Sequence, residues 1–227
     1  LQQAWRTRLG GEVVAGPVVA GGKVYAASNN GTLAALRRAD GGLVWQRDLG
    51  AAITATPLLA GGKVVVGTHE GIVHALDANT GEAAWQAFTG DRIEAAATLA
   101  RRPKRSLVIV GSYDWGVYAL DLADGNEVWA FDANRAVHPA AAVTGADVVV
   151  GCCSGVVYRI AVDSGSGAAL TTRDSAVLTT WPIVDGLAYG GGYDGTLVCV
   201  EVDTGRQRWA YAENDGPIWT RPAVGPR

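Results

Sequence analysis

The chain has 227 residues, of which 48% are apolar and 18% are charged, a composition typical of folded globular proteins and not of disordered ones. Its 19 basic and 22 acidic residues are scattered and leave a net charge of −3, so there is no basic stripe that would bind nucleic acid. No apolar run reaches the roughly 18 to 20 residues that span a bilayer, and we expect no membrane insertion.

Tryptophans recur along the whole chain at a spacing of about forty residues. The series is Trp5, Trp45, Trp85, Trp129 and Trp209, and Ala169 stands where one further member is expected. Self-similarity at a period of roughly 20 to 50 residues indicates a repeat architecture, in which each unit packs on its neighbours. The period therefore predicts the architecture before any single motif does.

Each repeat contains four short predicted strands, as the second one shows. We expect strands at 53–59, 63–67, 72–77 and 82–88, bounded by Gly, Asn and Asp turn residues, the signature of consecutive antiparallel hairpins. A four-stranded meander cannot bury both faces alone, so such units stack around an axis as an all-β β-propeller. A β-solenoid is the rival interpretation. Small residues suit the crowded axis, and they occur at 54–56, 95–97, 140–142 and 179–180.

In chain order, a partial repeat precedes five complete repeats, and a second partial repeat follows them. Residues 1–9 match a fourth strand, and residues 217–224 match a first strand. These ends predict an incomplete chain that forms part of a larger propeller, and a closed five-blade ring is the alternative. The predicted blades are 12–50, 51–90, 91–134, 135–174 and 175–214, with 1–11 and 215–227 as parts of a further blade.

The polar residues form no recognisable catalytic or metal motif. His69, His74 and His138 are the only histidines, and none has the spacing typical of a zinc site. No nucleophile-elbow motif occurs either. We therefore predict no catalytic residue and no metal ligand.

The cysteines and the one basic run are expected to be structural or solvated. Cys152 and Cys153 fall in the turn between the second and third strands of a repeat, and Cys199 falls in a strand. Since three cysteines do not form a disulfide framework, we expect two reduced thiols in a hairpin and one small core residue. The run at 101–105 is predicted to be the solvated tip of a longer hairpin.

The turn before each tryptophan carries a family resemblance. Residues 75–85 read A-L-D-A-N-T-G-E-A-A-W, which resembles the tryptophan-docking pattern A-x-D-x-x-T-G-x-x-x-W of PQQ-like (pyrroloquinoline-quinone-like) repeats. Residues 119–129 and 199–209 are looser copies, and 159–169 is the most degraded copy. The resemblance implies a propeller in which each indole packs on the neighbouring blade, with Trp5, Trp45, Trp85, Trp129 and Trp209 as docking residues.

Several relatives within this family imply different cellular compartments and activities. Residues 90–96 and 108–114 look like the C-terminal propeller of aminoadipate-semialdehyde-dehydrogenase-like adenylating enzymes, which would imply a cytoplasmic protein. Secreted relatives include a lipoprotein of the outer-membrane β-barrel assembly machinery and would imply a periplasmic or extracellular one. Quinoprotein alcohol dehydrogenases place adjacent cysteines against PQQ and hold calcium with Glu, Asn and Asp. Only Cys152 and Cys153 match that set, so we expect no cofactor.

Loops at one mouth of the central channel are the best candidate for binding, because loops on a rigid scaffold present side chains. The aligned position at the start of each predicted first strand holds Val14, Thr54, Glu94, His138, Leu178 and Trp219. The candidate binding residues are Arg92, Glu94, Tyr113, His138, Tyr193 and Trp219.

These residues predict recognition of a protein partner, a peptide end or a small polar ligand. The expected function is a non-catalytic interaction or ligand-sensing module within a larger multidomain protein. A quinoprotein oxidoreductase fragment and an envelope protein-assembly scaffold are the alternatives.

Overall fold

The computed structural model describes residues 3–213 and 216–225, and these form five sheets, each of four antiparallel strands in sequence order. We number the sheets blade 1 to blade 5. The described residues contain no helix, which confirms the all-β fold class. The same residues therefore include no helix long and apolar enough to cross a membrane.

The blades share one pattern of a short first strand followed by three longer strands. Blade 1 has β1 (Val18–Ala20), β2 (Lys23–Ala27), β3 (Thr32–Arg37) and β4 (Leu43–Asp48); blade 2 has β5 (Leu58–Ala60), β6 (Lys63–Gly67), β7 (Ile72–Asp77) and β8 (Ala83–Phe88); blade 3 has β9 (Thr98–Arg101), β10 (Ser106–Gly111), β11 (Gly116–Asp121) and β12 (Glu127–Asp132). Blade 4 has β13 (Ala142–Val143), β14 (Asp147–Gly151), β15 (Val156–Ala161) and β16 (Gly167–Thr172); blade 5 has β17 (Ile183–Val184), β18 (Leu187–Gly191), β19 (Leu197–Glu201) and β20 (Gln207–Tyr211).

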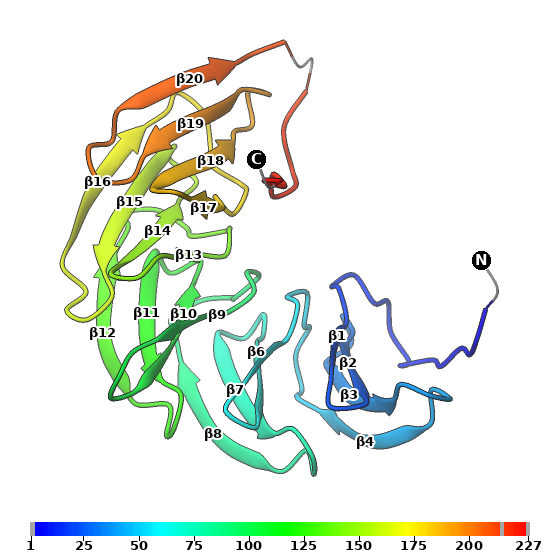
Figure 1. The fold of residues 1–227 in the computed structure, drawn as a ribbon. Coiled ribbons are helices and arrows are strands. Elements are labelled where there is room, and N and C mark those ends of the chain that lie inside the picture. The colour runs from blue at the N-terminus through cyan, green and yellow to red at the C-terminus, as the bar shows by residue number, and fades with distance from the viewer. Residues whose placement is uncertain (1–2, 214–215, 226–227) are drawn as a thin grey trace.

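The blades follow one another around an arc, with the first strands on its inside and the fourth strands on its outside (Figure 1). First strands of successive blades are in contact where β1 meets β5, β5 meets β9 and β9 meets β13. The arc is open between blade 5 and blade 1 (Figure 1). For the described residues, the alternative of a closed five-blade ring is therefore wrong.

The second strand of blade 2 is buried on both faces because this blade lies between blades 1 and 3. Val64, Val65 and Val66 of β6 are at most 1% exposed. Val64 and Val66 pack with Leu33 of blade 1, whereas Val65 packs with Val108 of blade 3. Alternate side chains of a strand point to opposite faces, so an uninterrupted apolar run builds two different inter-blade cores.

The first strand of blade 2 is shorter than predicted. The expected strand at 53–59 begins only at Leu58, because the preceding backbone bonds to neighbouring loops and not to β6. Ile53 N donates to Ser28 O at 3.4 Å, and Ala52 O accepts from His69 N at 3.0 Å. Pro57 also has no backbone N–H, so it cannot donate a hydrogen bond to a neighbouring strand. Most of the small residues near the axis therefore precede the first strands in irregular segments, and Ala142 is the exception, as the first residue of β13.

Neither terminal segment is a strand in the structure. Residues 3–9 and 217–224 have no ladder partner among the described residues, so the expected fourth and first strands do not form there. Their hydrogen bonds would need the two middle strands of the same blade. The expected segment ends at residues 1–2, 214–215 and 226–227 lie outside the described residues.

Tryptophans of the fourth strands pack on the turn of the next blade. Trp45 is 6% exposed, and its indole stacks on Gly81, where an added Cβ would lie 2.6 Å from the ring. Gly81 has φ +70°, a conformation that favours glycine. The Nε1 donor distances are 2.9 Å for Trp5 to Arg38 O, 3.1 Å for Trp45 to Ala78 O, 3.0 Å for Trp85 to Leu122 O and 2.7 Å for Trp129 to Val162 O.

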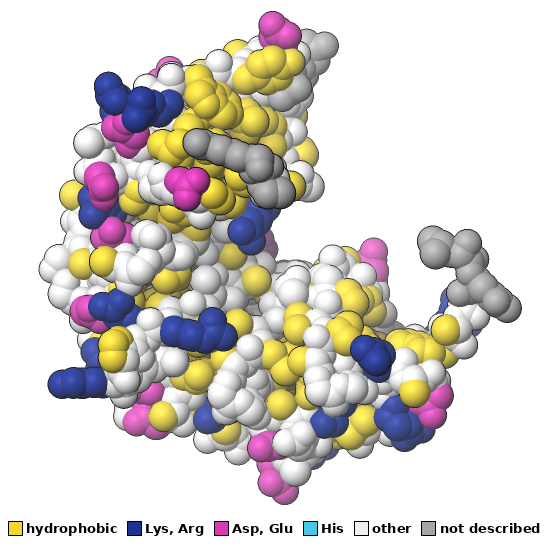
Figure 2. Space-filling model, viewed as in Figure 1, with side chains coloured by type: hydrophobic (Ala, Val, Ile, Leu, Met, Phe, Trp, Pro, Cys, Tyr) yellow, Lys and Arg dark blue, Asp and Glu magenta, His cyan; other side chains and the backbone are white. Residues whose placement is uncertain are grey.

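Trp209 differs from the other docking tryptophans, since no blade follows blade 5 in the described residues. Its side chain is 43% exposed and lies beside Tyr211, which is 48% exposed. Figure 2 shows hydrophobic side chains gathered over blade 5 beside the opening of the arc. The predicted docking role of Trp209 is therefore not seen.

The basic run is only partly solvated. Arg101, Lys104 and Arg105 are exposed as predicted, but Arg102 forms an ion pair with Asp163 of blade 4 and donates to the Gly145 carbonyl. The longer hairpin of blade 3 thus reaches the neighbouring blade, which the sequence did not predict.

Candidate functional site at the channel mouth

Two sets of loops from all five blades lie on the same side of the arc and form the mouth of the central channel. The turns between the second and third strands bond to the segments that enter each blade, always by a backbone N–H to a carbonyl oxygen. This repeated bond fixes the mouth residues on a rigid frame. The donor and acceptor residues are Asn29 and Glu12, His69 and Ala52, Tyr113 and Arg92, Cys153 and Ala136, and Tyr193 and Ala176, each at 3.0 Å.

Glu94 is the centre of a polar cluster at this mouth. Arg92 Nε lies 2.9 Å from Glu94 Oε1, and the Tyr113 hydroxyl donates to Glu94 Oε2 at 2.8 Å. His138 Nε2 lies 3.4 Å from the same Oε2. Four of the six predicted binding residues are therefore brought together, from blades 3 and 4, around one carboxylate that is 22% exposed.

His69 extends the Glu94 cluster into blade 2. Its Nε2 lies 3.0 Å from Thr54 Oγ1 and 4.0 Å from Glu94 Oε1. His69 is not among the predicted binding residues, because its spacing from the other histidines was tested only against a zinc site. A signal existed, because His69 aligns with Tyr113 in the turn between the second and third strands.

Burial and charge shift the pKa values of this cluster. Burial and the hydrogen bond to Glu94 raise the pKa of Tyr113 to about 12. The hydrogen bond with Tyr113 and the charge of Glu94 raise the pKa of Arg92, whose guanidinium carbon lies 4.0 Å from the Tyr113 ring centroid. Burial raises the pKa of the Cys153 thiol, with smaller contributions from Cys152 and Glu94. These shifts favour the protonated forms of the Tyr113 hydroxyl and the Cys153 thiol.

Tyr193 and Trp219 form a separate aromatic pair at the same mouth. Their ring centroids are 5.7 Å apart at 87°, an edge-to-face contact. Tyr193 is 56% exposed and Trp219 is 61% exposed. The two remaining predicted residues therefore contact each other, and neither is among the hydrogen-bond or ion-pair partners that the described residues provide to Glu94.

A third exposed aromatic residue lies in the mouth turn of blade 3. Trp115 is 48% exposed and carries a positive φ of 79°. The Arg135 guanidinium lies 5.7 Å from its ring centroid. Trp115 stands where the other blades have a turn glycine, and it is not among the predicted binding residues.

The inner segments of blades 2 to 5 line a partly open axial cavity of about 560 Å³. Its walls are small residues, including Thr56, Ala97 and Ala141, together with Arg221. Thr98 Oγ1 donates to Ala141 O at 2.8 Å across blades 3 and 4. The channel therefore has a mostly uncharged wall beneath a charged rim.

The adjacent cysteines of blade 4 lie in a hairpin turn and are not joined in a disulfide. Cys152 is fully buried and its Sγ lies 3.0 Å from Ser154 Oγ, so the sulfur faces the core and not an open quinone site. Both Cys152 and Cys153 are free thiols in the hairpin turn. Within residues 3–213 and 216–225, no group of three or more His, Cys, Asp and Glu side chains has a metal-binding arrangement.

Replacing Glu94 with glutamine is expected to lower the pKa of Tyr113 from about 12 toward the ordinary tyrosine value of about 10, because the carboxylate acceptor is lost. A phenol whose folded pKa is raised stabilises the fold below the unfolded pKa, and this contribution is lost as pH rises through the folded pKa. NMR titration of isotope-labelled tyrosine, assigned with Tyr113→Phe, measures the change. Glu70→Gln, at an exposed mouth position, is the control, and an unchanged Tyr113 titration in Glu94→Gln would contradict the assignment.

The chain is similar to a known repeat family and to a solved propeller structure. A PQQ-like repeat model, described as outer membrane protein assembly factor BamB, matches residues 2–211. The fold is similar to the crystal structure of BamB from Moraxella catarrhalis, with 22% identity and a TM-score of 0.78, over 92% of this chain. This chain spans 64% of that one. A comparison with curated proteins found no match.

Proposed function

The chain belongs to the PQQ-like repeat family of outer membrane protein assembly factor BamB, and from this premise we propose that it is a non-catalytic scaffold that binds a protein partner through the channel mouth. The family description supports the assembly role. The relation to adenylating enzymes, expected from residues 90–96 and 108–114, stays a prediction.

The exposed aromatic residues of the mouth are the observation that carries this proposal. Trp115, Tyr193 and Trp219 expose between 48% and 61% of their surface, although large aromatic side chains are normally buried. Tryptophan, tyrosine and arginine are the residues most enriched among energetically dominant interface contacts. Arg92 and Arg135 lie against aromatic rings of the same surface, so the composition of the mouth is that of a protein interface.

The Glu94 cluster supports a defined orientation of the partner. A carboxylate that already has three protein partners, in Arg92, Tyr113 and His138, holds these side chains in place before binding. A preorganised surface loses less side-chain entropy when a partner docks. The cluster therefore serves as a rigid polar rim beside the aromatic contacts.

The proposal predicts where a partner crosslinks. A photoreactive amino acid at Trp115 or at Tyr193, introduced in cells, is expected to capture the same protein from both positions. The control is Gln46, which is exposed on the outer strand β4. Equal capture from Gln46, or no protein capture from either mouth position, would overturn the proposal.

A further inference from the structure

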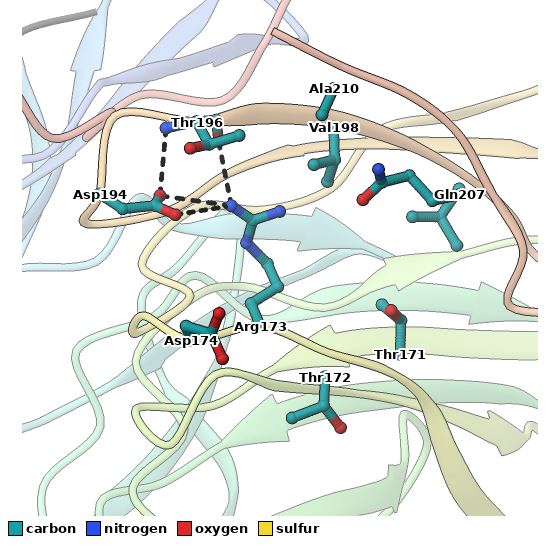
Figure 3. Close-up of a pocket in the computed structure, with 10 residues that line it drawn as sticks. Thr171, Thr172, Arg173, Asp174, Asp194, Thr196, Val198, Gln207 and Ala210 are labelled. Carbon is teal, nitrogen blue, oxygen red and sulfur yellow. Dashed lines mark hydrogen bonds and ion pairs between the residues drawn. The ribbon is translucent and has the colours of Figure 1, made fainter. Parts of the chain in front are cut away.

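The groove between blades 4 and 5 contains a second polar site, away from the Glu94 cluster. It encloses about 200 Å³, the volume of roughly six water molecules. Figure 3 shows Arg173 in its centre, with Thr171 on one side and Val198 and Gln207 on the other. The walls combine hydroxyl and amide groups with an apolar floor.

Blade 5 lacks the tyrosine that fills the equivalent grooves between blades 2 and 3 and between blades 3 and 4, and the groove between blades 1 and 2, with His74 at this position, is also open. The third residue of the third strand is Tyr118 in blade 3, whose hydroxyl donates to Asp114 at 2.7 Å, and Tyr158 in blade 4, whose hydroxyl donates to Ala133 O at 2.9 Å. The equivalent residue of blade 5 is Val198. Loss of a phenol ring from this position leaves space between the blades.

Blade 4 changes in the same region. The fourth repeat has Ala169 in place of the docking tryptophan, and Ala169 pairs with Tyr158, whereas Trp129 pairs with Ala119 in blade 3. The register shift therefore falls at a different point of the blade 4 ladder. Both blades that border the groove depart from the repeat, which is where functional positions are expected in an otherwise regular sequence.

Arg173 occupies a position that is uncharged in blades 1 to 3. Its backbone N–H bonds to Gly155 O, as those of Leu49, Thr89 and Ala133 bond to the equivalent carbonyls. The Arg173 side chain is only 9% exposed. A charge placed in this inter-blade position requires partners, because burial of an arginine is otherwise costly.

The partners present satisfy only part of the guanidinium. Nη2 of Arg173 lies 3.1 and 3.3 Å from the Asp194 carboxylate oxygens and 3.5 Å from Thr196 O. Nε is buried and has no hydrogen-bond partner among the described residues. Figure 3 shows the other terminal nitrogen turned away from Asp194, toward Val198 and Gln207. One donor face of the arginine is therefore directed into the groove.

The charges of the groove restrict the ligand class. A carboxylate suits the guanidinium, but a simple anion would also face the carboxylates of Asp174 and Asp194, which line the same groove. A simple cation would face Arg173. A molecule that carries both charges complements the arginine and the aspartates together. Its carboxylate would lie on Arg173 and its ammonium group toward Asp174, which is exposed.

We infer that the groove between blades 4 and 5 binds a small zwitterionic amino acid. Arg173 receives the carboxylate, and Asp174 receives the ammonium group. Thr171 and Gln207 face the polar part of the ligand, and Val198 lies beneath it. The site is distinct from the Glu94 cluster and needs no partner protein.

Isothermal titration calorimetry of the whole chain with L-serine, acetate and ethanolamine tests this inference. L-serine carries both charges and each of the other two carries one. L-serine is expected to bind at least about tenfold more tightly than either. No binding of L-serine, or equally tight binding of acetate, would overturn the inference.

Variants separate the groove from the rest of the surface. Val198→Tyr introduces the tyrosine of blades 3 and 4 and is expected to fill the groove. Asp174→Asn removes the proposed partner of the ammonium group. Each variant is expected to lower the affinity for L-serine by about tenfold or more. Glu70→Gln makes the same change of charge at an exposed position of blade 2 and is expected to leave the affinity unchanged. If Val198→Tyr does not fold, Asp174→Asn decides alone, and full affinity in Asp174→Asn would exclude the proposed site.

Discussion

Replacing Trp181 with alanine is expected to lower the free energy of unfolding by about 3 to 5 kcal/mol, the range for removal of a large buried aromatic side chain. Trp181 is 2% exposed and is the largest fully buried side chain of the described residues. It belongs to the core of blades 4 and 5 together with Val149, Val177 and Val198. Urea denaturation followed by circular dichroism measures the loss.

The size of this effect depends on a compensating glycine. A Cβ added at Gly190 would lie 1.8 Å from the Trp181 ring, so Gly190→Val alone is expected to destabilise the protein through a steric clash. Blade 4 has Ala141 and Val150 at the equivalent positions, both buried. The double variant Trp181→Ala, Gly190→Val reproduces that pair and is expected to recover stability, with a coupling of about 1 to 3 kcal/mol. Additive losses would show that the two residues are not a packing pair.

Replacing Trp85 with alanine is expected to cost about 3 to 5 kcal/mol of unfolding free energy, because its indole is 8% exposed and lies between two blades. Its Nε1 donates to Leu122 O at 3.0 Å, and its ring covers Gly125. Loss of the ring opens a cavity and leaves the Leu122 carbonyl without this partner. Chemical denaturation of the purified chain measures the change.

Trp209 provides the matched control for Trp85. It occupies the same strand position in blade 5, but it is 43% exposed and contacts chiefly Tyr189, at a centroid distance of 6.1 Å. Trp209→Ala is therefore expected to cost at most about 1 kcal/mol. Equal losses for Trp85 and Trp209 would show that docking on a following blade is not what stabilises the fourth strand.

Together, these variants test how the stability of a repeat protein is distributed. In such a fold each blade contacts only its neighbours, so stability is approximately a sum of terms for the blades and for their interfaces. The Trp85 variant measures the contribution of the interface between blades 2 and 3, and the Trp181 variant measures that of the interface between blades 4 and 5. The blade 4 and 5 interface lacks a docking tryptophan at Ala169, and Trp181 supplies a large indole nearer to the axis.

The candidate site was predictable only in part. Alignment of the repeats predicted that Glu94 and His138 take equivalent positions at the mouth, because each enters its blade at the same point. It did not predict that they contact each other, since that depends on the distance between neighbouring blades. Nor did it show that Tyr193 and Trp219 form a pair of their own, 5.7 Å apart.

The sequence by itself determined the repeat, the all-β class and most strands, because these follow from local patterns. Turn residues such as Asp77 and Gly81 and runs such as 64–66 carry their own conformational preferences. Only the tertiary structure decided the short first strands, the cluster around Glu94 and the open groove beside Arg173. The physical reason is that each of these depends on packing between blades, where residues about forty positions apart meet and a single change, such as valine for tyrosine at 198, leaves a space that no local pattern predicts.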